Sequence, residues 1–140
     1  MARLSVLGFG VAALVFGGAV SAGASTAAPH IVAHPNSQMV NKSIKLTGTH
    51  FKANSTITIE ECSSTAWVVV IQRPCDTKNL IAVKINGGGR FTSAFTVQTC
   101  PGGTTSSPGS SQTCYIGDPT PSGVDVIDLV GAVTVTVTGP

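Results

Sequence analysis

Side chains that could perform chemistry are few in this 140-residue chain, and their spacing matches no catalytic site. Three histidines, His30, His34 and His50, fall near the ends of predicted strands or in turns, and no G-x-S-x-G nucleophile elbow accompanies them. Glu60 and Glu61 are adjacent, and neighbouring residues of a strand point to opposite faces, so the two carboxyl groups do not face each other. We therefore predict that the protein is not an enzyme.

Metal and phosphate sites have little support in the sequence. Asp118, Asp125 and Asp128 occupy a loop-rich stretch, but their spacing matches no calcium-binding loop. The glycine-rich sequence NGGGR at residues 86–90 lacks the Lys-Ser/Thr pair of a phosphate-binding loop and is predicted to be a hairpin turn. We expect no metal site and no cofactor.

Four cysteines, Cys62, Cys75, Cys100 and Cys114, lack the C-x-x-C spacing of zinc and thioredoxin-type sites. In an exported chain such thiols oxidise to disulfides. Four cysteines allow three pairings, and we favour the sequential one because it closes two short local loops. The second loop, CPGGTTSSPGSSQTC, contains no hydrophobic side chain between its cysteines, so we expect its cross-link to be structural.

The N-terminus has the features of a secretory signal peptide. Arg3 is followed by an uncharged apolar run from Leu4 to Val20, and Ala22-Gly23-Ala24 fits the A-x-A cleavage pattern. A transmembrane anchor is the alternative, but the run is short for a hydrocarbon core of about 30 Å and contains four glycines. We predict a signal peptide at residues 1–24, one domain at residues 25–140, and a secreted protein that is not held at a membrane after cleavage.

The predicted mature chain is nearly neutral. Of eight Lys and Arg residues, removal of Arg3 leaves seven, against six Asp and Glu. Such a balance argues against tight nucleic-acid binding through phosphate neutralisation and against adhesion to anionic membranes.

Period-two alternation of apolar and polar residues runs through the mature chain, while helical periodicity is almost absent. The C-terminal TVTVTGP is the clearest example, with Val135 and Val137 on one face and Thr134 and Thr136 on the other. Turn signals such as HPNSQ, NGGG and DPTPSG separate the runs. We predict a monomeric all-β, immunoglobulin-like antiparallel sandwich of about seven to eight strands. Strands are expected at residues 30–34, 43–48, 55–62, 66–72, 79–86, 90–98, 114–117 and 134–140.

Taken in order, several stretches resemble the neocarzinostatin family, the actinobacterial apoproteins that carry enediyne chromophores. HPNSQMVNKSIKLTGTHFKANSTITIEEC resembles the family's opening strands, and CSSTAWVVVIQRPC its first disulfide loop with an internal tryptophan. NGGGRFTSAFTV, CYIGD and AVTVTV are similar to later segments. The chain is identified as a divergent member of this family.

The resemblance implies an immunoglobulin-like barrel, a separate ribbon, and a ligand-binding cleft between them. Matched position by position, the cleft would be lined by Trp67, Leu80, Tyr115, Gly117 and Glu60. A bound enediyne-type or other hydrophobic aromatic ligand would then reach DNA, so that any DNA damage and any antibacterial effect come from the cargo.

Two departures distinguish this chain from the family. Only Gln98 and Thr99 separate Val97 from Cys100, where the family has a long aromatic-bearing hairpin, and Glu60 replaces a cleft-lining glycine. Two hypotheses therefore stay open: a secreted small-molecule carrier, and a secreted interaction module of the cell envelope that binds through exposed loops such as Asp118–Asp128.

Overall fold

The computed structural model describes residues 27–68, 74–103 and 107–140, and within these ranges it contains strands, turns and no helix. Consequently no helix there is long and apolar enough to cross a membrane. The predicted signal peptide, residues 1–24, lies outside the described residues. Nine strands are described: β1 (His30–His34), β2 (Ser37–Met39), β3 (Ser43–Thr49), β4 (Thr56–Cys62), β5 (Ala66–Val68), β6 (Cys75–Lys84), β7 (Phe91–Thr96), β8 (Ser111–Gly123) and β9 (Val126–Thr138).

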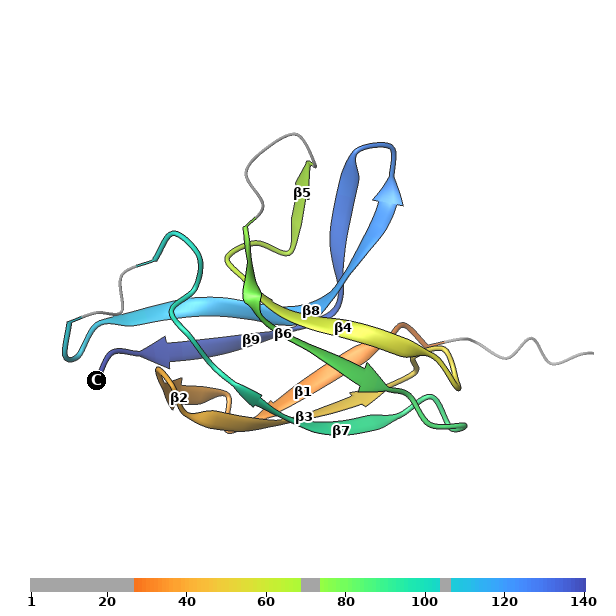
Figure 1. Ribbon diagram of the computed structural model, residues 1–140, viewed down its shortest axis with the longest axis horizontal. Coiled ribbons are helices and arrows are strands. Elements are labelled where there is room, and N and C mark those ends of the chain that lie inside the picture. Colours follow the sequence, from red (N-terminus) through yellow and green to blue (C-terminus); the bar gives the residue numbers. More distant parts are fainter. Residues whose placement is uncertain (1–26, 69–73, 104–106) are drawn as a thin grey trace, which may run out of the picture.

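The strands form two sheets packed face to face (Figure 1). The smaller sheet has the order β1-β3-β7, with both pairs antiparallel. The larger sheet has the order β2-β9-β8-β4-β6, and β5 pairs with β9 near the start of that strand. The predicted all-β sandwich is confirmed, with one parallel pair, β2 with β9, among the antiparallel ones.

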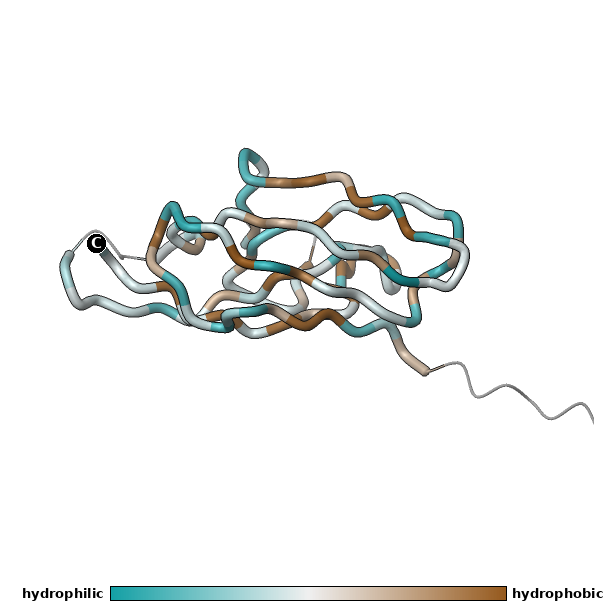
Figure 2. The backbone as a smooth tube through the Cα atoms, turned by 90° about the horizontal axis from the view of Figure 1, so that it is seen from below, coloured by the Kyte–Doolittle hydropathy of each residue, from teal (hydrophilic) through white to brown (hydrophobic). Residues whose placement is uncertain are grey.

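The alternation seen in the sequence determines what each sheet buries. Along β1 and β3 every second residue is buried, and the intervening residues are exposed. Figure 2, which views the molecule from below, shows hydrophobic and hydrophilic segments alternating along the chain. The main core between the sheets contains Ile31, Ala33, Ile44, Leu46, Phe51, Ile59, Val83, Ile85, Phe91, Phe95, Val97, Cys100, Cys114, Ile116, Val135 and Val137.

Both predicted disulfides are present, Cys62 with Cys75 and Cys100 with Cys114. The first lies within the larger sheet, because Cys62 of β4 is opposite Cys75 of β6. The second connects the segment after β7 to β8 and therefore ties the two sheets together. Each encloses a short loop, with sequence separations of 13 and 14 residues.

The prediction of loops between Asp118 and Asp128 is wrong. β8 continues to Gly123 and β9 begins at Val126, so this segment is a long hairpin with its turn at residues 124–125. Pro119 and Pro121 suggested a turn, because proline has no backbone N–H to donate to a neighbouring strand. The two prolines are two residues apart, however, so their backbone nitrogens face the same edge of β8. Beyond Gly117 the only described strand beside β8 is β9, so the other edge tolerates proline.

Two smaller differences concern the N-terminal part and the tryptophan strand. HPNSQ was predicted to be a turn, but residues 37–39 form the short strand β2 beside β9. The strand predicted at residues 66–72 is present at residues 66–68, and its remainder lies outside the described residues.

Candidate ligand-binding site

Three of the five predicted cleft residues lie in one row across the larger sheet. Glu60 of β4 is opposite Leu80 of β6 on one side and Gly117 of β8 on the other. Residues directly opposite each other share a face of the sheet. Ile59 and Ile116, the sequence neighbours, are buried in the main core, so the row points away from the smaller sheet.

The other two predicted residues pack in a separate apolar cluster. Its buried members are Cys62, Cys75 and Leu129, and Trp67 and Tyr115 pack against them. Tyr115 is opposite Cys62 in the pairing of β8 with β4. Since this cluster is distinct from the main core, the tryptophan belongs to a second apolar centre built on the first disulfide.

Glu60 joins the row to the cluster. One of its carboxylate oxygens and the sulphur atoms of Cys62 and Cys75 lie within 4.8 Å of one another. These three residues have the geometry of a potential metal group, but both sulphur atoms are bound in a disulfide, so neither supplies the thiolate that binds metals. The arrangement therefore places a carboxyl group at the border of an apolar surface.

The site carries a second carboxyl group, that of Asp118. Burial raises the pKa of Asp118, and the negative charge of Glu60 adds to this effect. Hydrogen bonds from the backbone of Thr58 and from the hydroxyl of Thr120 act in the opposite direction. Glu60 is 3% exposed, so both acids are held in a partly dry environment rather than in free solvent.

Gly117 allows β9 to approach this face closely. A Cβ atom at Gly117 would lie 2.7 Å from Cγ of Leu129 and 3.0 Å from the carbonyl oxygen of Val130. Any larger residue would push Leu129, a buried member of the apolar cluster, away from its place. The glycine therefore contributes to the site through packing.

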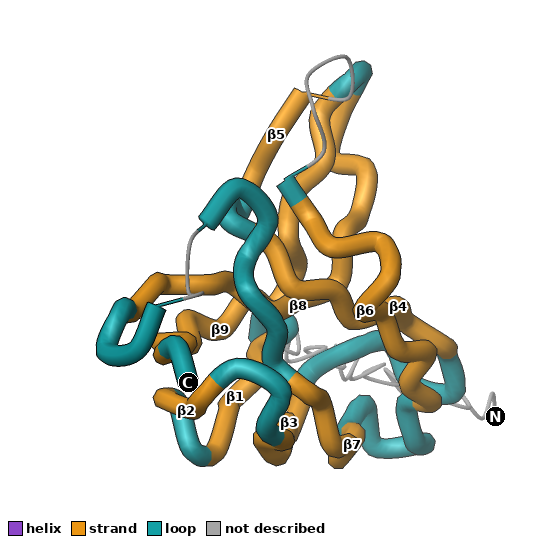
Figure 3. Tube along the Cα trace, turned by 60° about the vertical axis from the view of Figure 1, so that its left-hand side comes forward, coloured by secondary structure: helices purple, strands orange, loops and turns teal. Residues whose placement is uncertain are grey.

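Two segments stand beside this face. The far ends of β8 and β9, with β5 next to them, stand away from the sandwich (Figure 1). The loop that follows β7 rises on the same side of the larger sheet, as Figures 1 and 3 show. Residues 97–110, which follow β7, include no aromatic residue.

Glu61 is a buried ionisable residue whose burial the sequence did not predict. It points to the core side and is 0% exposed, and its Oε2 accepts hydrogen bonds from the backbone N–H of Gln98 at 2.8 Å and from Nδ2 of Asn79 at 3.4 Å. Its Oε1 is buried with no hydrogen-bond partner among the described residues. Burial raises the pKa of Glu61 to about 7, and the negative charge of Asp76 contributes to the same direction.

Glu60 and Glu61 thus lie on opposite faces, as predicted, and each lies beside a different disulfide. Glu61 and the sulphur atoms of Cys100 and Cys114 lie within 4.8 Å of one another. Period two predicts that the two side chains lie on opposite faces of β4. It does not predict that both are buried, at 3% exposure for Glu60 and 0% for Glu61, in a strand that lies inside the larger sheet between β8 and β6.

The structure is an immunoglobulin-like sandwich of two sheets that are joined by a disulfide. A second apolar cluster, separate from the main core, lies on the outer face of the larger sheet. The chain belongs to the neocarzinostatin family, whose family model matches residues 31–137. Among solved structures the chain is similar to macromomycin, with 16% sequence identity and a TM-score of 0.49. That match covers 81% of this chain and 100% of macromomycin. A sequence search of curated proteins finds no match.

Proposed function

We propose that the protein is a secreted small-molecule carrier whose ligand binds on the outer face of the larger sheet. The observation that supports this most is the convergence of five residues from four strands. The row of Glu60, Leu80 and Gly117 borders the apolar cluster that contains Trp67 and Tyr115. Aromatic and aliphatic surface with a few polar groups is typical of small-molecule sites.

Membership of the neocarzinostatin family supports the same class of protein, a non-enzymatic carrier, and supports export. The ligand in this proposal is a hydrophobic aromatic molecule of the enediyne type. Any DNA damage or antibacterial effect would belong to that cargo. Export rests on residues 1–24, and the N-terminal residue of protein collected from the medium tests the predicted cleavage after Ala24.

Titration of the protein with a panel of polycyclic aromatic ligands tests the proposal. Trp67 is the only tryptophan, so a change in its fluorescence reports on the proposed site. The matched variants are Leu80→Ala, on the row, and Val32→Ala, on the outer face of the smaller sheet. Leu80 is 46% exposed and Val32 is 50% exposed, so neither truncation opens a core cavity.

We expect Leu80→Ala to weaken binding by about tenfold, since burying a leucine side chain contributes about 1.5–3 kcal/mol. Val32→Ala should leave the affinity unchanged. No fluorescence change with any ligand, or equal losses in both variants, would count against a carrier. In that case the interaction module is favoured instead, with the tip of the β8–β9 hairpin as its exposed surface, where Val124 is 91% exposed.

A further inference from the structure

The larger sheet ends in a long strand that has one unpaired edge. β6 is the last strand in the order β2-β9-β8-β4-β6, and no other described strand pairs with its outer edge. It has 10 residues, whereas the other strands at the ends of the two sheets, β1, β2 and β7, have 5, 3 and 6. Sheet edges attract strands of other chains, and proteins usually shorten or block them. β6 contains no proline, so its edge is open to a partner strand.

The backbone groups at this edge are those of the even-numbered residues of β6. The N–H of Ile85 donates to the carbonyl of Ser55 at 2.8 Å, at the position that continues the register of β4 with β6. Hydrogen-bonded and non-bonded pairs alternate along an antiparallel ladder, so Val83 and Ile81, the next odd-numbered residues, also bond to β4. The N–H and C=O groups that point to the open edge are therefore those of Leu80, Ala82 and Lys84.

The smaller sheet reaches β6 only from its inward side in the described residues. Nδ2 of Asn79 donates to the carbonyl of Thr96, at the end of β7, at 2.8 Å, and it also donates to the buried carboxylate of Glu61. In Figure 1 β7 lies below β6, in the other sheet. These contacts leave the outward side chains of the second half of β6 exposed, at Leu80, Ala82 and Lys84.

The charges of β6 favour one register between two copies of this strand. If two β6 strands pair antiparallel through their open edges, even-numbered residues face even-numbered residues. With the two-fold axis at Leu80, Asp76 of each copy is opposite Lys84 of the other, and Leu80 is opposite itself. Moving the axis to Ile81 places Lys78 opposite Lys84, and moving it by one residue the other way leaves no ion pair. Because opposite charges across strands stabilise a pair and like charges destabilise it, the register centred on Leu80 is preferred.

We propose that two copies of this chain form a dimer through the edges of β6, antiparallel and centred on Leu80, in place of the monomer expected from the sequence. The two larger sheets then become one continuous sheet. Leu80 is 46% exposed, and Leu80 of the second copy covers part of this apolar surface. Oδ1 of Asp76 accepts the N–H of Lys78 at 2.9 Å, so Oδ2 can accept from Lys84 of the second copy. The contact needs no ligand, and it brings the Leu80 ends of the two candidate ligand sites together.

Sedimentation equilibrium of the disulfide-bonded mature protein, measured over a range of concentrations, tests this proposal. We expect the average mass to rise from that of one copy towards that of two. Lys84→Asp and Asp76→Lys should each raise the dissociation constant of the dimer by about tenfold, because two attractive pairs become repulsive. The chain that carries both substitutions has the wild-type net charge, and its dimer should be as strong as that of the wild type.

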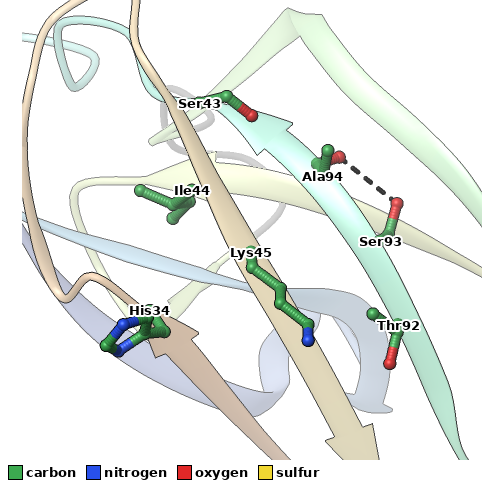
Figure 4. Close-up of a pocket in the computed structure, with 7 residues that line it drawn as sticks. All are labelled: His34, Ser43, Ile44, Lys45, Thr92, Ser93 and Ala94. Carbon is green, nitrogen blue, oxygen red and sulfur yellow. Dashed lines mark hydrogen bonds between the residues drawn. The ribbon is translucent and has the colours of Figure 1, made fainter.

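Two further variants separate this contact from other surfaces. Lys45→Asp is the matched control, because Lys45 is an exposed lysine of β3, the central strand of the smaller sheet, and lines a shallow depression on that sheet's outer face (Figure 4). It should leave the dissociation constant unchanged. Ala82→Pro removes an N–H that points to the open edge and not to β4, so it should abolish the dimer and retain the fold. Thermal unfolding of each variant checks the fold.

A mass that stays at one copy up to millimolar concentration would overturn the proposal, and so would equal effects of Lys84→Asp and Lys45→Asp. A dimer that persists with Ala82→Pro would show that the copies meet through another surface. Failure of the combined substitution to restore the dimer would overturn the register centred on Leu80. Because none of these measurements uses a ligand, their failure leaves the proposed carrier function unaffected.

Discussion

At the scale of single residues, the most unusual group is the carboxyl of Glu61. A fully buried acid with one oxygen unpartnered among the described residues is costly when it is charged, which is why burial raises its pKa to about 7. It nevertheless connects two parts of the fold. Its Oε2 accepts from Gln98, which follows β7, and from Asn79 of β6, whose Nδ2 also donates to the carbonyl of Thr96 at 2.8 Å. Glu61 thus fastens the end of the smaller sheet to the larger one.

This environment gives a prediction for the pH dependence of stability. A carboxyl whose pKa is raised from 4.5 to about 7 on folding binds more protons in the native state than in the unfolded state. The free energy of unfolding should therefore fall as pH rises from 4.5 to about 7, by on the order of 3 kcal/mol. Urea denaturation at a series of pH values measures this.

Glu61→Gln should remove most of the fall, because the amide does not ionise. The raised pKa of Asp118 acts in the same direction, so a smaller dependence should remain. Asp125→Asn is the matched control: Asp125 is exposed in the hairpin turn at a positive φ of 61°, which asparagine also tolerates. A wild-type profile that stays flat or rises across this pH window would contradict the assignment.

At the scale of elements, the two disulfides have different roles. Cys62 and Cys75 form part of the apolar cluster at the candidate site, whereas Cys100 and Cys114 belong to the main core. The loop between Cys100 and Cys114 has no hydrophobic side chain that could hold its ends. The covalent bond replaces the packing that would otherwise keep the segment after β7 against β8.

Removing the second disulfide should therefore affect stability much more than ligand binding. For Cys100→Ala with Cys114→Ala we expect a loss of about 3 kcal/mol in the free energy of unfolding, from the entropy of the opened loop. Urea denaturation and the Trp67 titration measure the two effects on the same protein. A loss of ligand affinity with unchanged stability would show that the loop belongs to the binding site.

Elements with strong alternation could be predicted from the sequence, and those governed by their neighbours could not. β3 and β7 alternate regularly, and their inward residues, Ile44, Leu46, Phe91 and Phe95, are all buried. The end of β8 contains two prolines and reads as a turn, and only its pairing with β9 explains why it is a strand. The three-residue strand β2 is too short and too polar to give a signal.

At the scale of the whole molecule, the sandwich separates two surfaces. The larger sheet carries the acids and the apolar cluster, and the smaller sheet carries exposed cations and hydroxyl groups. The sequence indicates the total charge but not this separation, because residues from distant segments make up each face. The sequence also does not show that Glu60, Leu80 and Gly117 lie side by side, because this depends on the register of the strands. The family resemblance predicted only that these residues share a cleft.

The proposed carrier is tested most directly by a two-dimensional NMR titration of backbone amides with the tightest aromatic ligand of the panel. We predict the largest shift changes on the outer face of the larger sheet, at Glu60, Leu80 and Gly117, together with the indole signal of Trp67. The amides of β1, β3 and β7 should be nearly unaffected. Shift changes confined to those three strands, or spread evenly over the molecule, would contradict a ligand site on the larger sheet.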